Sequence, residues 1–251
     1  SDLTTPDPVS LQREVRRLLD ADAQALAMEV SSIGLAQGRV EGMHFDVALF
    51  TNLTRDHLDF HQTMQQYEAA KSVLFGWPGL RQAAINLDDE AGCRFAALAR
   101  EHGVEVIGYS ARGDAAARPI APRVLAHDVS ATAEGLSFEL QADGTTWPIE
   151  VPLVGHFNVA NLLGVIGASY GCGISFEAAV AALPQLAPPP GRMQRVDSQS
   201  EPLVIVDYAH TPDALTQALE ALRPMVHARD GRLRVVFGAG GDRDPGKRAP
   251  M

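Results

Sequence analysis

The chain has 251 residues, 21 basic and 31 acidic side chains, and a formal net charge of −10 at pH 7. This length suits one large domain or two smaller ones, and the acidic balance argues against a nucleic-acid partner, which requires a basic face. No apolar run approaches the ~20 residues of a membrane helix, and two cysteines far apart in sequence indicate a reducing, cytoplasmic compartment.

The first hundred residues alternate between helical and strand-like patterns. Apolar positions at helical spacing predict helices over residues 10–22, 63–75 and 88–103. Ser10 and Thr63 are the expected N-caps, and Gly103 is the expected stop of the third helix. Short apolar runs predict strands over residues 25–30, 45–51, 82–87 and 104–110. Strands joined by helices indicate an α/β fold with a mostly parallel sheet.

The pattern changes over residues 118–154, where turn signals at 133–135 and 142–145 separate alternating runs. This predicts a small antiparallel meander. Helices are predicted again over residues 157–171 and 175–186. The stiff stretch APPPGR, residues 187–192, is the expected boundary between a domain of residues 1–187 and a second of residues 188–251. The second domain begins as another α/β unit, with strands over 202–208 and 232–241 and a helix near 212–223.

Glu29 is the first of several polar residues at the ends of predicted strands. Ligands of open α/β sheets bind at the carboxyl ends of strands, and a carboxylate there suits Mg²⁺, which prefers oxygen ligands. The alternative is a structural ion pair with an arginine such as Arg39. Spacing alone favours the ion pair.

The stretch FTNLTRDHLDFH, residues 50–61, is denser in polar groups. His57 and His61 are four residues apart and could share a helical face as transition-metal ligands, although no third ligand stands at zinc spacing. The alternative is a turn in which Asp56 or Asp59 caps the next element and the histidines are solvated.

Lys71 follows Tyr67 by one helical turn on an apolar stripe. Such a lysine either extends its charge to solvent or is partly desolvated and chemically unusual. Asn158 and Asn161 also lie one turn apart, near a helix start. Asn158 suits a cap, and the amide of Asn161 could bind a base edge.

Asp207 ends a predicted strand, and the chain enters the next helix through Pro212, with Tyr208 and His210 in the turn between them. Further on, GDRDPGK has the spacing of a phosphate-binding loop but not its chemistry. Its two aspartates put negative charge where phosphates would lie, and Arg248 stands where such a loop has Ser or Thr.

Eight ordered stretches together resemble the Mur ligases, most closely the MurE type: TTPDP, MEVSSIGLAQGRV, FTNLTRDHLDFH, YEAAK, GHFNVANLL, GRM, VDYAHTPDAL and GAGGDRDPGKR. The resemblance runs nearly end to end. It implies a Mur ligase central domain followed by the start of a Rossmann-like C-terminal domain. It also implies an ATP-dependent amide ligase of peptidoglycan synthesis. In that family ATP phosphorylates a substrate carboxylate to an acyl phosphate, and an incoming amine then displaces phosphate.

The same resemblance implies roles for single residues. Catalytic Mg²⁺ ligands would be Glu29, His57 and Lys71, the last as a carbamate (N6-carboxylysine). Contacts to UDP-MurNAc-L-Ala-D-Glu would come from Thr4, Thr5, Ser31, Gln37 and Arg39. Contacts to ATP would come from Asn161, Arg192, Asp207, Tyr208 and His210. Arg243 would grip the incoming diamino acid, meso-diaminopimelate or L-lysine. Asp56, Asp59 and His61 are left as structural.

The chain departs from the family pattern in two respects. The family's phosphate loop, G-x-x-G-K-[ST], and its specificity motif for the third amino acid do not occur in these residues. We therefore expect a fragment of a longer protein that has no ligase activity alone. A folylpolyglutamate synthetase relative would share VDYAHTPDAL and GGDRD, although TTPDP and MEVSSIGLAQGRV favour the muramoyl ligase. A non-catalytic binding or scaffold module is the alternative from another class.

Overall fold

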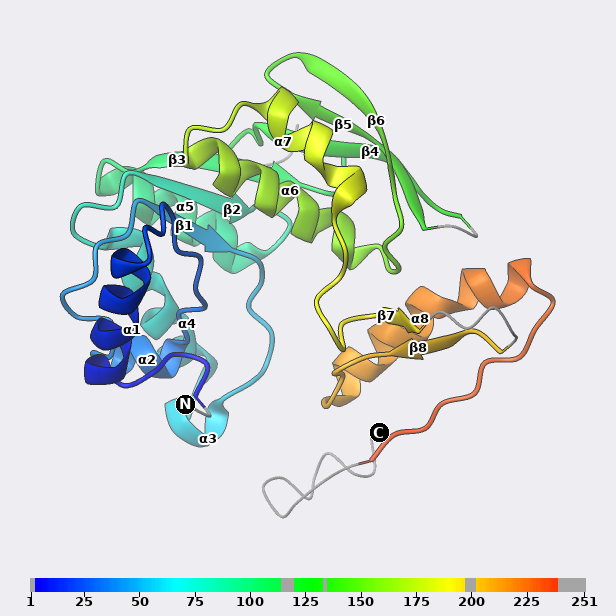
Figure 1. Ribbon diagram of the computed structural model, residues 1–251, viewed down its shortest axis with the longest axis horizontal. Coiled ribbons are helices and arrows are strands. Elements are labelled where there is room, and N and C mark those ends of the chain that lie inside the picture. Colours follow the sequence, from blue (N-terminus) through cyan, green and yellow to red (C-terminus); the bar gives the residue numbers. More distant parts are fainter. Residues whose placement is uncertain (1–2, 114–119, 133–134, 197–201, 239–251) are drawn as a thin grey trace. The chain divides into compact units, whose positions relative to one another are not determined.

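The computed structural model describes residues 3–113, 120–132, 135–196 and 202–238. Its secondary structure alternates between helices and strands, and the strands β1 to β6 form one sheet in chain order (Figure 1). The chain divides into two compact units. The first contains residues 1–109, 115–122 and 167–173, and the second contains residues 110–114, 123–166 and 174–251. The expected α/β class is confirmed.

The first unit contains the parallel part of the sheet. Its elements are α1 (Pro8–Asp20), α2 (Ser32–Ala36), β1 (Val47–Phe50), α3 (Leu58–His61), α4 (Met64–Ser72), the 3₁₀ turn η1 (Val73–Gly76), β2 (Gln82–Asn86), α5 (Glu90–Glu101) and β3 (Glu105–Ser110). β1 pairs with β2, and β2 with β3, in parallel register. Strands predicted over 45–51, 82–87 and 104–110 are therefore confirmed.

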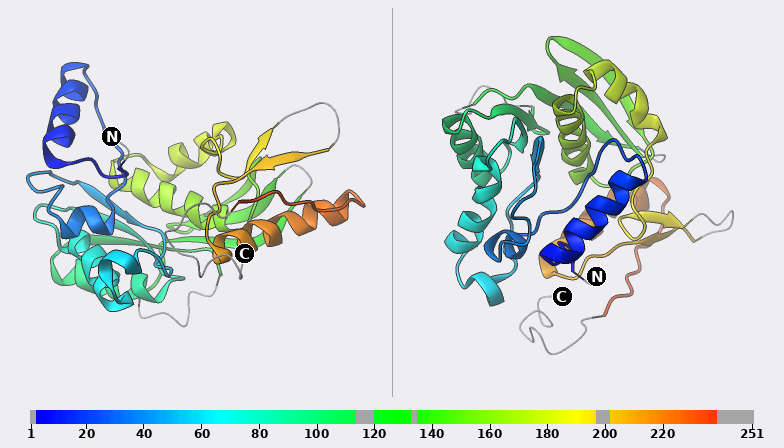
Figure 2. Two further views of the ribbon diagram at one scale, coloured as in Figure 1. Left: turned by 90° about the horizontal axis from the view of Figure 1, so that it is seen from below. Right: turned by 60° about the vertical axis from the view of Figure 1, so that its left-hand side comes forward.

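Helices cover both faces of these parallel strands (Figure 2). On one face, Phe95 of α5 packs with Phe50 of β1 and Phe75 of η1, and Phe75 and Phe95 stack with ring centroids 5.1 Å apart. On the other, a Cβ at Gly167 would lie 3.2 Å from Ala84, so α6 approaches the sheet closely there. Burial on two faces explains why these strands read as continuous apolar runs.

Side chains from neighbouring elements fix the point where β1 ends. Tyr109 donates its hydroxyl to the carbonyl of Phe50 at 2.8 Å, and Asn86 donates its amide to the carbonyl of Thr51 at 2.7 Å. The carboxylate of Asp89 accepts the amide of Leu53 at 2.8 Å. The loop that continues toward α3 therefore starts from a backbone held at three of its residues.

Short polar side chains cap the helices of this unit. α4 begins after Thr63, as predicted, and α5 begins after Asp89; each cap accepts a backbone amide of its first turn. Gly103, with φ +75°, follows the end of α5, where only a residue tolerant of the left-handed region fits. The predicted N-cap of the first helix is wrong. Asp7, not Ser10, is the N-cap, because Pro8 supplies a preset first position.

The strand predicted over residues 25–30 is not formed. Residues 23–30 are irregular and mostly exposed, and no part of the described chain pairs with them. An apolar run does not become a strand without a neighbour to accept and donate its backbone hydrogen bonds. Glu29 consequently lies in an irregular connection rather than at a strand end.

The second unit begins with the predicted antiparallel meander. It consists of β4 (Val124–Ala131), β5 (Leu136–Ala142) and β6 (Thr145–Val151). Asp143 and Gly144 have φ values of 47° and 79°, the left-handed pair that a two-residue hairpin requires. The other predicted turn, 133–135, lies mostly outside the described residues.

Two helices follow the meander as predicted. α6 (Phe157–Gly171) crosses from the second unit into the first, and α7 (Phe176–Ala182) begins after the cap Ser175 and continues as the 3₁₀ turn η3 (Leu183–Gln185). None of the helices in the described part of the chain is long and apolar enough to cross a membrane.

The C-terminal stretch contains the antiparallel pair β7 (Gln194–Val196) and β8 (Val204–Val206), followed by α8 (Pro212–Ala228). β8 and α8 were expected, whereas β7 was not, because its three residues carry no strand pattern. The prediction of a strand over 232–241 is wrong for residues 232–238, and residues 239–241 lie outside the described part of the chain. Residues 232–238 have no ladder partner among the described residues, and Val236 is fully exposed.

Candidate functional site

Thr5 joins the N-terminal stretch to the loop that carries Glu29 and Ser31. Its side chain is fully buried; Oγ1 accepts the amide of Ser31 at 2.9 Å and lies 3.1 Å from the Glu29 carbonyl oxygen, to which it donates. Arg39 donates to the Thr5 carbonyl at 2.9 Å and to the Gln37 side-chain oxygen. We call Thr5, Ser31, Gln37 and Arg39 the Thr5 cluster.

The Thr5 cluster brings together most of the residues expected to contact the muramoyl substrate. Thr4, the remaining one, is exposed immediately before it. Gly34 leaves the space that Thr5 needs, because a Cβ there would lie 3.0 Å from the Thr5 side chain. Ser31 also caps α2 by accepting the amide of Gly34 at 3.0 Å. The sequence motif MEVSSIGLAQGRV therefore folds as one hydrogen-bonded unit.

Glu29 has an exposed side chain and makes no ion pair within the described chain. The structural alternative, a pair with Arg39, is not formed; the guanidinium of Arg39 binds Gln37 and Thr5 instead. The carboxylate of Glu29 is thus available for a ligand.

His57 occupies an unusual backbone position at the start of α3. Its φ and ψ are 54° and 24°, in the left-handed region, which costs a residue with a Cβ about 1–2 kcal/mol. The amide of His57 donates to the Asp56 carboxylate at 2.8 Å, which helps to hold this conformation. Strain of this kind gathers at functional sites.

The ring of Tyr67, on α4, contacts the side chains of three other residues. His61 stacks on it with ring centroids 5.3 Å apart, His57 meets it edge-on at 5.8 Å, and the Lys71 Nζ lies 5.1 Å from its centroid. His61 Nε2 is also 2.9 Å from the hydroxyl oxygen of Ser32. We call Ser32, His57, His61, Tyr67 and Lys71 the Tyr67 cluster.

Burial changes the proton affinities of this cluster. It lowers the pKa of Lys71, which Asp56 raises to a lesser degree. Burial, with smaller contributions from His57 and Lys71, also lowers the pKa of His61, and burial and Asp56 raise that of Tyr67 to about 12. Of the two alternatives for Lys71, partial desolvation is the one found, and the alternative of a solvated His61 does not hold because its side chain is buried.

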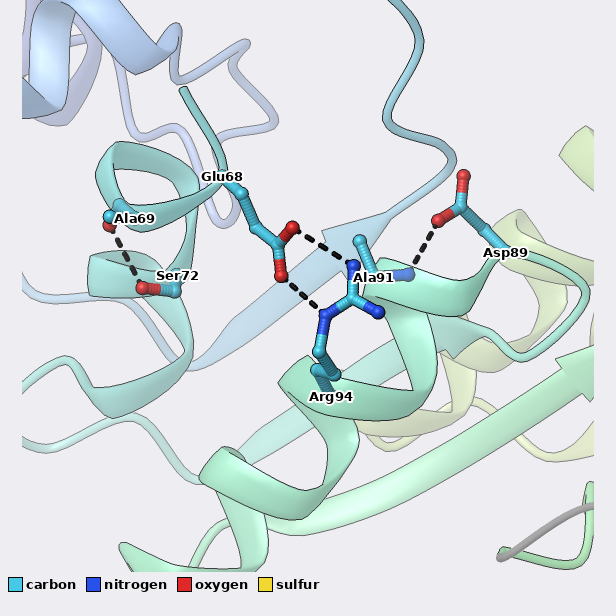
Figure 3. A network of polar contacts seen from close by, with 6 residues as sticks. All are labelled: Glu68, Ala69, Ser72, Asp89, Ala91 and Arg94. Carbon is cyan, nitrogen blue, oxygen red and sulfur yellow. Dashed lines mark hydrogen bonds and ion pairs between the residues drawn. The ribbon is translucent and has the colours of Figure 1, made fainter. Parts of the chain in front are cut away.

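An ion pair fixes α4, which carries Tyr67 and Lys71, against α5 (Figure 3). Arg94 binds both carboxylate oxygens of Glu68, through Nε at 2.5 Å and through Nη2 at 2.9 Å. Asp89 caps the start of α5 through the amide of Ala91. The same Asp89 carboxylate holds the loop after β1, so the supports of α4 and of the His57 loop converge on α5.

A carboxylate on Lys71 would improve the donor set for Mg²⁺. No three His, Cys, Asp or Glu residues within the described chain are grouped to hold a metal, which leaves the transition-metal alternative for His57 and His61 unsupported. Glu29 and His57 supply two donors, and an amine is not an Mg²⁺ ligand. A carboxylate formed on Lys71 would add the oxygen donors that this ion prefers.

A third cluster lies in the turns beside β7 and β8. The Asp207 carboxylate accepts the amides of Met193 and Ala209, each at 2.8 Å. The Arg192 guanidinium lies 4.7 Å from the ring centroid of Tyr208, whose carbonyl is 3.0 Å from His210 Nδ1. We call Arg192, Asp207, Tyr208 and His210 the Asp207 cluster; it contains four of the five expected ATP contacts.

The fifth expected ATP contact, Asn161, is exposed on α6, where its amide donates to the side-chain oxygen of Asn158 at 3.1 Å. Asn158 in turn donates to the carbonyl of Val154 at 2.8 Å and so ties the helix start to the preceding loop. Arg243 lies outside the described residues, as do most of the residues around it.

Comparison with known families matches two domain families to the chain. Residues 1–169 match the Mur ligase middle domain, and residues 191–251 match the Mur ligase glutamate ligase domain. The chain belongs to the Mur ligase family. The resemblance seen in the eight motifs is thereby confirmed, and each of the three clusters is built from residues of those motifs.

Named relatives of this Mur ligase chain agree with the MurE type. It is 52% identical over 249 residues to the UDP-N-acetylmuramoyl-L-alanyl-D-glutamate--2,6-diaminopimelate ligase of Ralstonia nicotianae, covering 99% of this chain and 48% of that protein. The ligase of the same name from Coxiella burnetii is 48% identical over 248 residues, with 99% and 50% covered. The chain thus spans about half the length of the curated relatives it matches.

Solved structures agree with both the fold and the relatives. A UDP-N-acetylmuramoyl-L-alanyl-D-glutamate--2,6-diaminopimelate ligase superposes with a TM-score of 0.76 at 36% identity, over 99% of this chain and 49% of that one. The apo form of L. casei FPGS superposes with a TM-score of 0.58 at 16% identity, over 86% of this chain and 57% of that one, which shows a shared fold alone.

Sequence reasoning missed two members of the Tyr67 cluster. His61 was left as structural, and Ser32 was not singled out. The four-residue spacing of His57 and His61 was the available signal, but it indicated a shared metal rather than a shared aromatic neighbour. Ser32 lies 29 residues before His61, and nothing local in the sequence indicates that they meet.

Proposed function

We propose that the full-length protein containing this chain is an ATP-dependent amide ligase that adds meso-diaminopimelate to UDP-MurNAc-L-Ala-D-Glu. The observation that carries the proposal is the 52% identity, over nearly the whole chain, to a ligase named for that reaction. L-Lysine was the other candidate amino acid; the two relatives described above are both named for 2,6-diaminopimelate, which favours that substrate.

The Tyr67 cluster and Glu29 would provide the magnesium site. Glu29 and His57 each offer one donor, and the carbamate of Lys71 would offer oxygen donors. Bound there, Mg²⁺ would neutralise charge on the ATP phosphates during transfer of the terminal phosphoryl group to the substrate carboxylate. Amine attack on the resulting acyl phosphate would form the amide and release phosphate.

Lys71 is suited to carbamylation because its amine is desolvated. A neutral amine attacks carbon dioxide, forming the N–C bond of the carbamate and releasing one proton. Burial lowers the pKa of Lys71, so the folded protein holds more of the neutral form at a given pH than a solvated lysine would. The product carries a carboxylate beyond the position of the amine.

The Thr5 cluster and Thr4 are proposed to hold the muramoyl dipeptide. Within the cluster, the guanidinium of Arg39 is oriented by Gln37 and by the Thr5 carbonyl. The guanidinium has five N–H donors and these contacts use three, so one donor on each terminal nitrogen remains for a carboxylate of the UDP-linked substrate.

The Asp207 cluster and Asn161 are proposed to hold ATP. Each Asp207 oxygen accepts one backbone amide and retains capacity for a second donor, such as a ribose hydroxyl. Arg192 lies with its guanidinium over Tyr208, an arrangement that leaves its edge donors free for phosphate oxygens. Arg243 is proposed to receive the incoming diamino acid.

Domain division and location are part of the same proposal. Residues 1–187 would form the central domain, and residues 188–251 would begin the C-terminal domain. A cytoplasmic location is supported by Cys93 and Cys172, which are both free thiols.

A direct assay tests the proposed function. The full-length protein is incubated with ATP, Mg²⁺, UDP-MurNAc-L-Ala-D-Glu and either diaminopimelate or lysine, and products are identified by mass. We expect ADP and a tripeptide product with diaminopimelate. Product with lysine alone would correct the substrate, and competition by folate would favour the folylpolyglutamate alternative. No ATP-dependent product with any of these substrates would favour the scaffold alternative.

A further inference from the structure

Tyr67 is the point at which segments far apart in sequence meet. Its side chain is only 6% exposed, and it is the one buried residue of α4. Its ring contacts His57 and His61, which stand at the start and the end of α3. Lys71 follows Tyr67 by one turn on α4, and its Nζ also lies against the ring. The Lys71 Nζ lies 5.1 Å from the ring centroid, so the Tyr67 ring borders the space that the Lys71 side chain occupies.

His61 extends these contacts to the loop of Glu29. The hydrogen bond between His61 and Ser32 joins two buried side chains, 5% and 1% exposed. Ser32 is the first residue of α2 and follows Glu29 by three positions. A buried polar pair of this kind is expensive to break, because each partner left alone loses its hydration without compensation.

We propose that His61 and Tyr67 are positioning residues that hold the segments of Glu29, His57 and Lys71 in one arrangement before any metal or nucleotide binds. The metal part of this inference rests on the proposed function, since it takes those three residues as the magnesium ligands. That His61 and Tyr67 hold these segments together is inferred from the contacts of their side chains alone.

Simple core filling does not account for this choice of side chains. A core position is filled most cheaply by an apolar residue, yet position 61 has an imidazole that requires a buried partner. The aromatic cluster of Phe50, Phe75 and Phe95 in the same unit has entirely apolar side chains. The polar aromatic cluster occurs where the proposed ligands are.

The first experiment measures hydrogen–deuterium exchange in the full-length protein without metal. Tyr67→Leu is compared with Phe95→Leu, the same kind of substitution in the apolar cluster. Tyr67→Leu is expected to raise exchange together in residues 29–36, 55–62 and 63–72, whereas Phe95→Leu raises it around α5 and the strands. Exchange confined to α4 in Tyr67→Leu, or the same pattern in both variants, would overturn the proposal.

The second experiment measures the Mg²⁺ concentration that gives half-maximal ligase activity. Removing a residue that orients a metal ligand typically weakens metal affinity by about 10–100-fold, so Tyr67→Leu and His61→Leu are expected to raise this concentration at least about 10-fold. Tyr67→Phe keeps the ring, so the Mg²⁺ concentration for half-maximal activity should stay near that of the unsubstituted protein. An unchanged Mg²⁺ dependence in Tyr67→Leu would contradict the metal part. If the unsubstituted protein has no ligase activity, the proposed function fails, and the exchange comparison still decides whether the three segments are held together.

Discussion

The Tyr67 cluster and the Asp207 cluster differ in burial and in the kind of contact that holds their side chains. In the Tyr67 cluster, ring faces and one buried hydrogen bond join side chains to side chains, and three of its members are less than 7% exposed. In the Asp207 cluster, an exposed carboxylate binds two backbone amides, and Tyr208 is 62% exposed. The difference suggests that the proposed metal ligands are fixed in advance, whereas the proposed nucleotide contacts remain open to solvent until ATP binds.

The largest expected effect comes from removing the amine that would become a carbamate. Lys71→Ala in the full-length protein should lower kcat about 10²–10³-fold, the usual cost of losing one group that stabilises charge in the transition state. Added short carboxylic acids should restore part of the activity by occupying the vacated position. Activity equal to the unsubstituted protein without added acid would refute the role of Lys71.

Asp207→Ala tests the open cluster. It removes the acceptor of two backbone amides, so the turns carrying Arg192 and Tyr208 lose their connection. We expect the KM for ATP to rise about 10-fold, equivalent to about 1.4 kcal/mol, with little change in Mg²⁺ dependence. Asp207→Asn retains one acceptor and should show a smaller effect. A larger change in Mg²⁺ dependence than in the KM for ATP would break the distinction between the clusters.

The buried histidine predicts a pH effect on stability. The pKa of His61 in the folded protein lies below its ordinary value of 6.5, so between these two values the unfolded chain binds more protons. The free energy of unfolding should therefore fall as the pH drops below 6.5 and stop falling below the folded-state pKa. His61→Gln, which does not titrate, should show a shallower slope in chemical unfolding over this range. Equal slopes would show that His61 is not desolvated.

The smallest effect is expected from the ion pair between α4 and α5. Glu68→Gln weakens its contact to Arg94, whose side chain is 55% exposed, and should lower the free energy of unfolding by about 0.5–1 kcal/mol. Urea unfolding measures this change. Because Glu68 adjoins Tyr67 but lies outside its cluster, Mg²⁺ dependence should stay the same. A shift comparable to that of Tyr67→Leu would mean that any loosening of α4 disturbs the site.

Local sequence signals predicted much of this fold and failed where a partner was needed. Thr63 caps α4 as expected, and α6 has the bounds that its apolar pattern predicts, because these signals act within a few residues. The runs at 25–30 and 232–238 have strand composition but form no ladder with another described segment, since pairing depends on a second segment. The short β7 is a strand only through its partner β8.

The candidate site shows the same division. Motif residues identified Glu29, His57 and Lys71, and these stay predictions as magnesium ligands. Contacts that join their segments were not predictable, because His61 and Ser32 meet only through the packing of α3 and α4 beside α2. Residue identity therefore indicated the chemistry, and tertiary structure was required to show what holds it in place.

The most direct test of the central claim is a search for the carbamate itself. The full-length protein is equilibrated with ¹³C-labelled bicarbonate, Mg²⁺ and ATP and examined by ¹³C nuclear magnetic resonance, beside Lys71→Ala. The account predicts one carbamate resonance that is present in the unsubstituted protein and missing from the variant. No carbamate resonance in the protein, or an equal one in Lys71→Ala, would contradict it.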